Sequence, residues 1–148
     1  SDPTYTQIME ASRRAERVSV PDGIVAAARE IAETTDIKAI CCFTQSGTTA
    51  LLTARERPRV PILALSPLIE TGRRLALTWG THCVLVEAVH RFKLAVVAAV
   101  QVARDQGYAT AEDKIVVTAG VPFNVEGTTN ILRVATCDER LLSMADPE

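Results

Sequence analysis

The stretch CCFTQSGTTALL, residues 41–52, predicts a buried strand that turns directly into a helix. Its first three residues are apolar, and apolar residues return at helical spacing after Gly47. Gly47 permits a tight turn, and the helix that follows directs free N–H groups and a partial charge of about +0.5 at the loop. With the hydroxyls of Thr44, Ser46 and Thr49 as further donors, the loop fits two roles. It either caps the helix or cradles an anion such as phosphate.

The loop matches neither of the common nucleotide-binding motifs. It lacks the GK[ST] of a P-loop and the GxGxxG of a dinucleotide fingerprint. No histidine or carboxylate lies close by in sequence to activate Ser46 as a nucleophile. Capping and anion binding both stay open on these residues alone.

Outward from this loop, apolar strands alternate with helices along the chain. We expect strands at 38–43, 60–66, 81–87, 113–120 and 129–135, and helices at 5–17, 21–35, 48–57, 68–80 and 91–107. Fully apolar strands separated by helices indicate a mostly parallel sheet covered on both faces. No helix separates the last two strands, so the final strand is expected to run antiparallel. The predicted fold is a three-layer α/β/α domain with a mixed five-stranded sheet.

Composition and charge argue against several classes of function. The net charge of the 148 residues is −2, both signs are interspersed and aromatic residues make up 4%. Nucleic acid is therefore not an expected partner, because its binding needs a clustered basic surface or stacking aromatics. A membrane is not expected either, since no apolar run reaches the ~18 residues of a span.

The four cysteines are Cys41, Cys42, Cys83 and Cys137. They form no CxxC pair and no cluster with histidine, so no metal site is expected. Cys41 and Cys42 should point to opposite faces of their strand. Free thiols in apolar runs fit a reducing cytoplasm.

Several motifs in sequence order resemble the C-terminal domain of the bacterial type of pyruvate kinase. The first is IKAICCFTQSGTTALLTARERPRVPILALSP, residues 37–67, followed by LALTWG, residues 75–80, and VVTAGVPFNVEGTTNILRV, residues 116–134. The family shows a strand, T-x-S-G-x-[ST]-A, a helix and RPRxPI in this order. The resemblance covers about residues 22–134. It implies a lead-in from a missing catalytic barrel at 1–21, the domain proper at 22–136 and a tail at 137–148.

The resemblance implies a regulatory and oligomerisation domain of an enzyme whose active site lies elsewhere. Pyruvate kinase transfers a phosphoryl group from phosphoenolpyruvate to ADP in glycolysis, giving pyruvate and ATP. Its catalytic lysine, magnesium and potassium belong to domains outside this chain. We therefore expect no catalytic residue, no cofactor and no activity from this chain alone. The alternative is a free-standing phosphometabolite-binding module that regulates another protein. A small phosphatase or transferase is a third interpretation, but no paired acid and base supports it.

In the family, this domain holds the phosphate of an allosteric effector. The corresponding phosphate-binding residues here are Thr44, Gln45, Ser46, Gly47, Thr48 and Thr49. A second loop closes over the effector, and its candidates here are Gly120, Val121, Pro122, Phe123, Asn124 and Gly127. Some regulated members carry lysine at the position of Gln45 and arginine at that of Thr48. A monophosphate, a nucleotide such as AMP, or inorganic phosphate or sulfate therefore fits this chain better than a sugar bisphosphate.

The last predicted strand is a candidate for self-association. An unpaired sheet edge invites a partner strand, and in the family this strand and adjoining helices pair with a twofold mate. We expect a homodimer here and a homotetramer of the parent enzyme. The predicted interface residues are Asn130, Ile131, Leu132, Arg133 and Val134. On the helix at 68–80, Arg73 and Arg74 are expected to form a solvated face.

Overall fold

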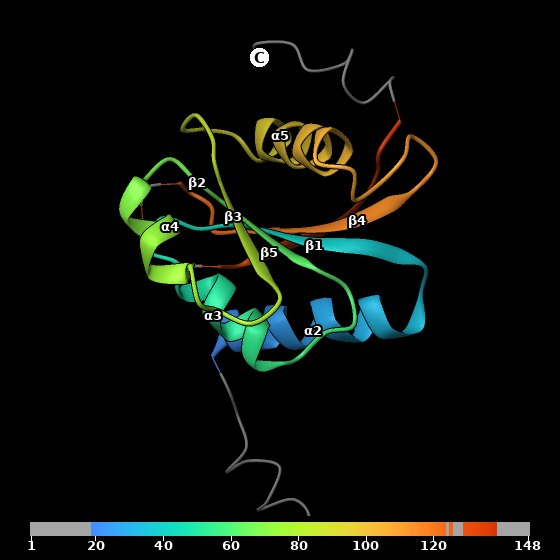
Figure 1. Ribbon diagram of the computed structural model, residues 1–148. Helices are drawn as coiled ribbons and strands as arrows, with labels where there is room; N and C mark the ends of the chain where they lie inside the picture. Colours follow the sequence, from blue (N-terminus) through green and yellow to red (C-terminus); the bar gives the residue numbers. More distant parts are fainter. Residues whose placement is uncertain (1–18, 124, 126–128, 139–148) are drawn as a thin grey trace, which may run out of the picture.

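A computed structural model of the chain describes residues 19–123, 125 and 129–138. Helices cover both faces of one sheet (Figure 1). In chain order, the described elements are α2 (Val20–Thr34), β1 (Ile37–Phe43), α3 (Thr48–Arg55), β2 (Ile62–Ser66), α4 (Ile69–Leu75), β3 (Thr81–Leu85), α5 (Phe92–Asp105), β4 (Lys114–Ala119) and β5 (Ile131–Thr136). The helix predicted at 5–17 lies outside the described residues. No helix in the described part of the chain is both long and apolar enough to cross a membrane.

The five strands follow the order β3-β2-β1-β4-β5. The central strand β1 pairs in parallel with β2 and β4, and β3 pairs in parallel with β2. Only β5 is antiparallel, with Ile131 opposite Ala119 and Thr136 opposite Lys114 on β4. The predicted mixed α/β sheet with an antiparallel last strand is confirmed, and β3 and β5 form its two edges.

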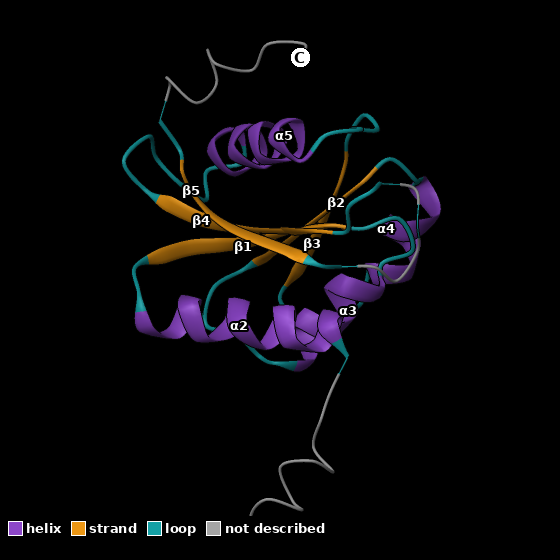
Figure 2. Cartoon of the chain, turned by 180° about the vertical axis from the view of Figure 1, so that it is seen from behind, coloured by secondary structure: helices purple, strands orange, loops and turns teal. Residues whose placement is uncertain are grey.

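Helix α5 covers one face of the sheet, and α2, α3 and α4 lie on the other (Figures 1 and 2). Side chains alternate between the two faces along β1. Cys41 packs with Val100 in the cluster under α5, whereas Cys42 packs with Ala28 in the cluster under α2. The prediction that the two adjacent cysteines point apart is therefore confirmed, and both thiols are fully buried.

Local chemistry explains where the helices begin and end. The Ser19 hydroxyl accepts a hydrogen bond from the Asp22 amide at the start of α2, and Pro21 occupies the first turn. Gly107, with φ of +80°, follows the end of α5 as predicted. Helix α4 is shorter than predicted and ends at Leu75 instead of near residue 80. The Leu75 carbonyl accepts from the amide of Thr78, three residues later, so a tightened turn replaces the α-helical bond.

Candidate functional site: a pocket at the carboxyl ends of the strands

A pocket opens where the parallel strands end, the edge at which ligands bind in open α/β sheets. It lies between the loop 44–49 after β1, residues 87–89 after β3, and Gly120, Phe123 and Val125 after β4. The polar lining residues are Thr44, Gln45, Ser46, Thr48, Thr49, Glu87 and Thr129. The other lining residues are Phe43, Leu65, Pro67, Ala88, Val89, Gly120, Phe123 and Val125.

The loop between β1 and α3 is held by its own hydroxyl groups. Gly47 has φ of +93°, and its amide donates a 2.9 Å hydrogen bond to Oγ1 of Thr44. The amide of Thr48 donates to Oγ of Ser46 at 3.4 Å, and the Ser46 and Thr48 hydroxyls lie 2.9 Å apart. Gly47 is the N-cap of α3, one of the two residues that the capping alternative proposed, and the Ser46 hydroxyl accepts from the first amide of the helix. The side chains of Thr44, Ser46 and Thr48 line the pocket.

Side chains from the end of β2 and from α4 also hold the backbone of this loop. The carbonyl of Gln45 accepts hydrogen bonds from the hydroxyls of Ser66 and Thr71. The carbonyl of Ser46 accepts one from the Arg74 guanidinium at 2.8 Å. Arg73 and Arg74 are both exposed, as predicted, but Arg74 also ties the loop to α4. The solvated-face interpretation is therefore incomplete for this arginine.

The residues just before β5 contact both predicted effector loops. Thr129 contacts the loop 44–49, and Asn130 contacts the loop that begins at Gly120. The buried hydroxyls of Thr49 and Thr129 hydrogen-bond to each other. The side-chain amide of Asn130 brackets the backbone of Val121, because its oxygen accepts from the Val121 amide at 3.0 Å and its nitrogen donates to the Val121 carbonyl at 2.6 Å. Asn130, predicted at the dimer interface, therefore also fixes the conformation of the segment around Val121.

The structure brings most of the predicted effector residues together. Of the two predicted loops, the residues that line the pocket are Thr44, Gln45, Ser46, Thr48, Thr49, Gly120 and Phe123. Gly47, Val121 and Pro122 shape the backbone without lining it. Asn124 and Gly127 lie outside the described residues.

Sequence reasoning missed the wall that follows β3. Glu87 and Val89 line the pocket there, and Glu87 is the one charged side chain among its described lining residues. A signal was available, since β3 was predicted to be parallel to its neighbours and its carboxyl end had to reach the same edge of the sheet. Within the described part of the chain, no three His, Cys, Asp or Glu side chains are placed to hold a metal ion.

The fold agrees with a comparison to known proteins. Residues 22–135 match the model of the family "Pyruvate kinase, alpha/beta domain". The chain belongs to this family. It is 35% identical to pyruvate kinase of Methylorubrum extorquens over 134 residues, and 40% identical to a pyruvate kinase of Agrobacterium vitis over 130 residues. These matches cover 90% and 88% of this chain but only 28% and 27% of the relatives.

Solved structures give the same result. The structure of Cryptosporidium parvum pyruvate kinase in complex with ADP superimposes with a TM-score of 0.75 at 25% sequence identity. This match covers 82% of the present chain and 24% of that structure. The chain thus spans about a quarter of the length of the pyruvate kinases that it resembles.

Proposed function

We propose that this chain is the regulatory and oligomerisation domain of a pyruvate kinase, and that it binds a phosphorylated effector or inorganic phosphate at residues 44–49. The parent reaction, phosphoryl transfer from phosphoenolpyruvate to ADP, takes place in domains outside this chain, together with its magnesium and potassium ions. One observation carries the proposal. The hydroxyl-rich loop after β1 and the segment around Gly120 and Phe123 form one pocket at the carboxyl edge of the sheet.

The chemistry of the loop suits a phosphate group. The amides of Thr49 and Ala50 lie in the first turn of α3, where a helix has no carbonyl partners for its N–H groups. Phosphate oxygens accept such bonds, and the helix dipole favours their negative charge. The pocket offers hydroxyls in place of lysine or arginine among its described lining residues. A neutral hydrogen bond contributes about 1 kcal/mol against roughly 1.5–3 for a charged one, so we expect a monophosphate to bind with moderate affinity.

Calorimetric titration of the purified chain tests this proposal. The ligands are fructose 6-phosphate, ribose 5-phosphate, AMP and inorganic phosphate, each added to the wild type and to Ser46→Ala. The control is Thr34→Ala, which removes a hydroxyl that bonds the Glu30 carbonyl at 2.8 Å on α2. Thr34 precedes β1, whereas the loop follows the other end of that strand. We expect binding that Ser46→Ala weakens about tenfold and that Thr34→Ala leaves unchanged. Equal binding by all three proteins would show that residues 44–49 only cap a helix.

We further propose that β5 mediates homodimerisation. It is an edge strand, and Arg133 and Val134 on it are exposed. Val134→Asp should dissociate the dimer in sedimentation velocity at micromolar concentration, since a buried charge at an apolar contact is costly. The matched control is Leu85→Asp on β3, the opposite edge, where Leu85 is 58% exposed. A wild-type monomer at high micromolar concentration would contradict the assignment.

The compartment that we propose is the cytoplasm. All four cysteines are free thiols, and three of them are buried. Reduced cysteines are typical of a reducing compartment.

A further inference from the structure

Glu87 places a negative charge in the pocket at a distance from the phosphate-binding loop. It follows β3, whereas the loop 44–49 follows β1, and β2 lies between these two strands. Neighbouring strands lie about 4.8 Å apart, so the ends of β1 and β3 are separated by roughly 10 Å. This is the length of a sugar phosphate, so a ligand whose phosphate sits at the start of α3 can extend its other end to Glu87.

No positive charge in the described lining of the pocket offsets this carboxylate. The lining also includes the apolar side chains of Phe43, Leu65 and Val89, and Glu87 itself is exposed to solvent. The nearby cation Arg74 donates to the Ser46 carbonyl and is not among the lining residues. An ionised carboxylate only accepts hydrogen bonds. It therefore attracts a hydroxyl or amino group and repels a second phosphate.

We propose that Glu87 makes this site select effectors with a single phosphate and a hydrogen-bond donor at the opposite end, and that it excludes sugar bisphosphates. The inference rests on the proposed function of the loop 44–49 as a phosphate site. It adds the residue that decides which phosphorylated molecules fit.

Two ligands that differ by one phosphate test the selection. The dissociation constants of fructose 6-phosphate and fructose 1,6-bisphosphate are measured by calorimetry for the wild type, Glu87→Gln and Glu87→Lys. The control is Glu30→Gln, which makes the same change of net charge as Glu87→Gln at an exposed position of α2. Circular dichroism of each variant confirms that it is folded before titration.

We expect the wild type to bind the monophosphate at least about tenfold more tightly than the bisphosphate, because like charges in one pocket oppose each other. In Glu87→Gln, the dissociation constants of the monophosphate and the bisphosphate should lie within about threefold of each other. Glu87→Lys should bind the bisphosphate more tightly than the monophosphate. Glu30→Gln should keep the wild-type ratio.

The titrations distinguish failure of the phosphate site from failure of the selection by Glu87. If the wild type prefers the monophosphate and both Glu87 variants keep that ratio, the phosphate site stands and the selection by Glu87 is wrong. If the wild type binds neither ligand, the proposed phosphate site fails, and the selection by Glu87 fails with it. If no variant binds either ligand, both proposals are overturned.

Discussion

The guanidinium of Arg74 donates a 2.8 Å hydrogen bond to the backbone carbonyl of Ser46, 28 residues earlier in the chain. The bond joins α4 to the loop that we propose to hold phosphate. Together with the bonds to the Gln45 carbonyl from Ser66 and Thr71, it anchors the carbonyls of two consecutive loop residues. These bonds fix the backbone of the loop, which preorganises it for the phosphate that we propose it binds.

Arg74→Met should loosen this loop with little effect on global stability. Methionine keeps the aliphatic stem but removes the donor, and a hydrogen bond from an exposed side chain contributes about 1 kcal/mol or less. We expect faster hydrogen–deuterium exchange in peptides that cover residues 44–49. Arg73→Met is the matched control, since Arg73 is the adjacent exposed arginine on α4. Equal exchange in the two variants would contradict a role for Arg74 in fixing the loop.

Thr49 and Thr129 should be strongly coupled in a double-mutant cycle. Their hydroxyls bond each other in a buried position between α3 and the start of β5. Thr49→Val leaves the buried Thr129 hydroxyl without this partner, which should lower the free energy of unfolding by about 1–3 kcal/mol. Replacing both threonines with valine should be nearly neutral. The free energy of unfolding in urea is to be measured for both single variants and the double variant. Additive losses would show that the contact contributes little.

The fold could be predicted from the sequence because its strands are short, fully apolar runs separated by helical patterns. Residues 38–43 and 60–66 are short apolar runs, and a buried parallel sheet requires such runs. The direction of β5 followed from the missing crossover helix before it. The end of α4 was not predictable in this way, because residues 75–80 keep an apolar pattern although the chain leaves the helix at Leu75.

The site was predictable where one segment of sequence supplies it and was missed where tertiary structure does. The segment 44–49 carries its hydroxyls and its glycine within six residues, so the pattern alone marked it as either a helix cap or an anion site. Glu87 and Arg74 come from other elements, and neither has a local motif. Their proximity to the loop follows from the strand order and from the position of α4, which periodicity does not determine.

Gly47→Ala should destabilise the protein more than an alanine at the other positive-φ glycines. Gly47 has φ of +93°, and a Cβ there would lie 3.3 Å from the side chain of Leu75. Gly107 has φ of +80° with open space around it, so Gly107→Ala carries the backbone strain without the contact. We expect a loss of about 1–2 kcal/mol at Gly107 and more at Gly47. Gly23→Ala, inside α2 with open space, should instead stabilise by up to about 1 kcal/mol. Denaturant unfolding of the three variants tests this order.

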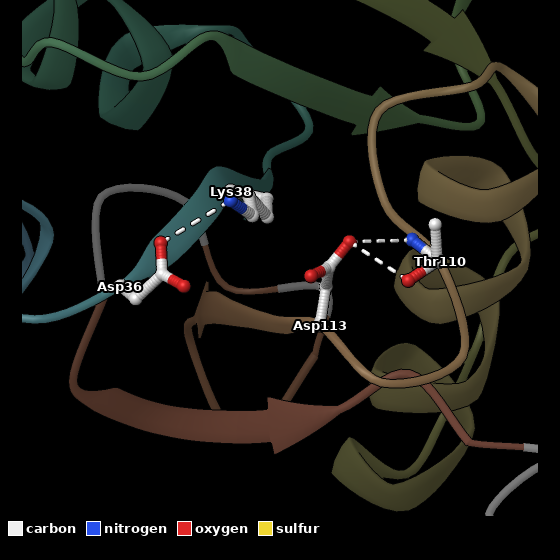
Figure 3. A network of polar contacts seen from close by, with 4 residues as sticks. All are labelled: Asp36, Lys38, Thr110 and Asp113. Carbon is white, nitrogen blue, oxygen red and sulfur yellow. Dashed lines mark hydrogen bonds and ion pairs between the residues drawn. The ribbon is translucent and has the colours of Figure 1, made fainter.

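Asp113 closes the turn before β4, at the opposite end of this strand from the pocket. Figure 3 shows Asp113 with Thr110, and Lys38 with Asp36. The carboxylate of Asp113 accepts hydrogen bonds from the amide of Thr110 at 2.7 Å and from the Thr110 hydroxyl at 3.0 Å. Lys38 lies nearby and pairs with Asp36 at 3.2 Å. The hydrogen bond from the Thr110 amide, with help from the Thr110 hydroxyl and the charge of Lys38, lowers the pKa of the Asp113 carboxyl.

Asp113 should therefore contribute to stability at neutral pH and lose that contribution in acid. Its folded pKa lies below the unfolded value of about 3.9, so the stabilisation is present above that value and disappears as the pH falls through the folded pKa. We expect the difference in Tm between wild type and Asp113→Asn to shrink below about pH 4. Thr110→Val is the internal control, because it removes only the hydroxyl and keeps the backbone donor that has the larger effect. An NMR titration of the Asp113 carboxyl carbon should give a midpoint below 3.9 in the wild type, and most of that depression should remain in Thr110→Val. A midpoint at the ordinary aspartate value would show that the turn does not depend on this charge.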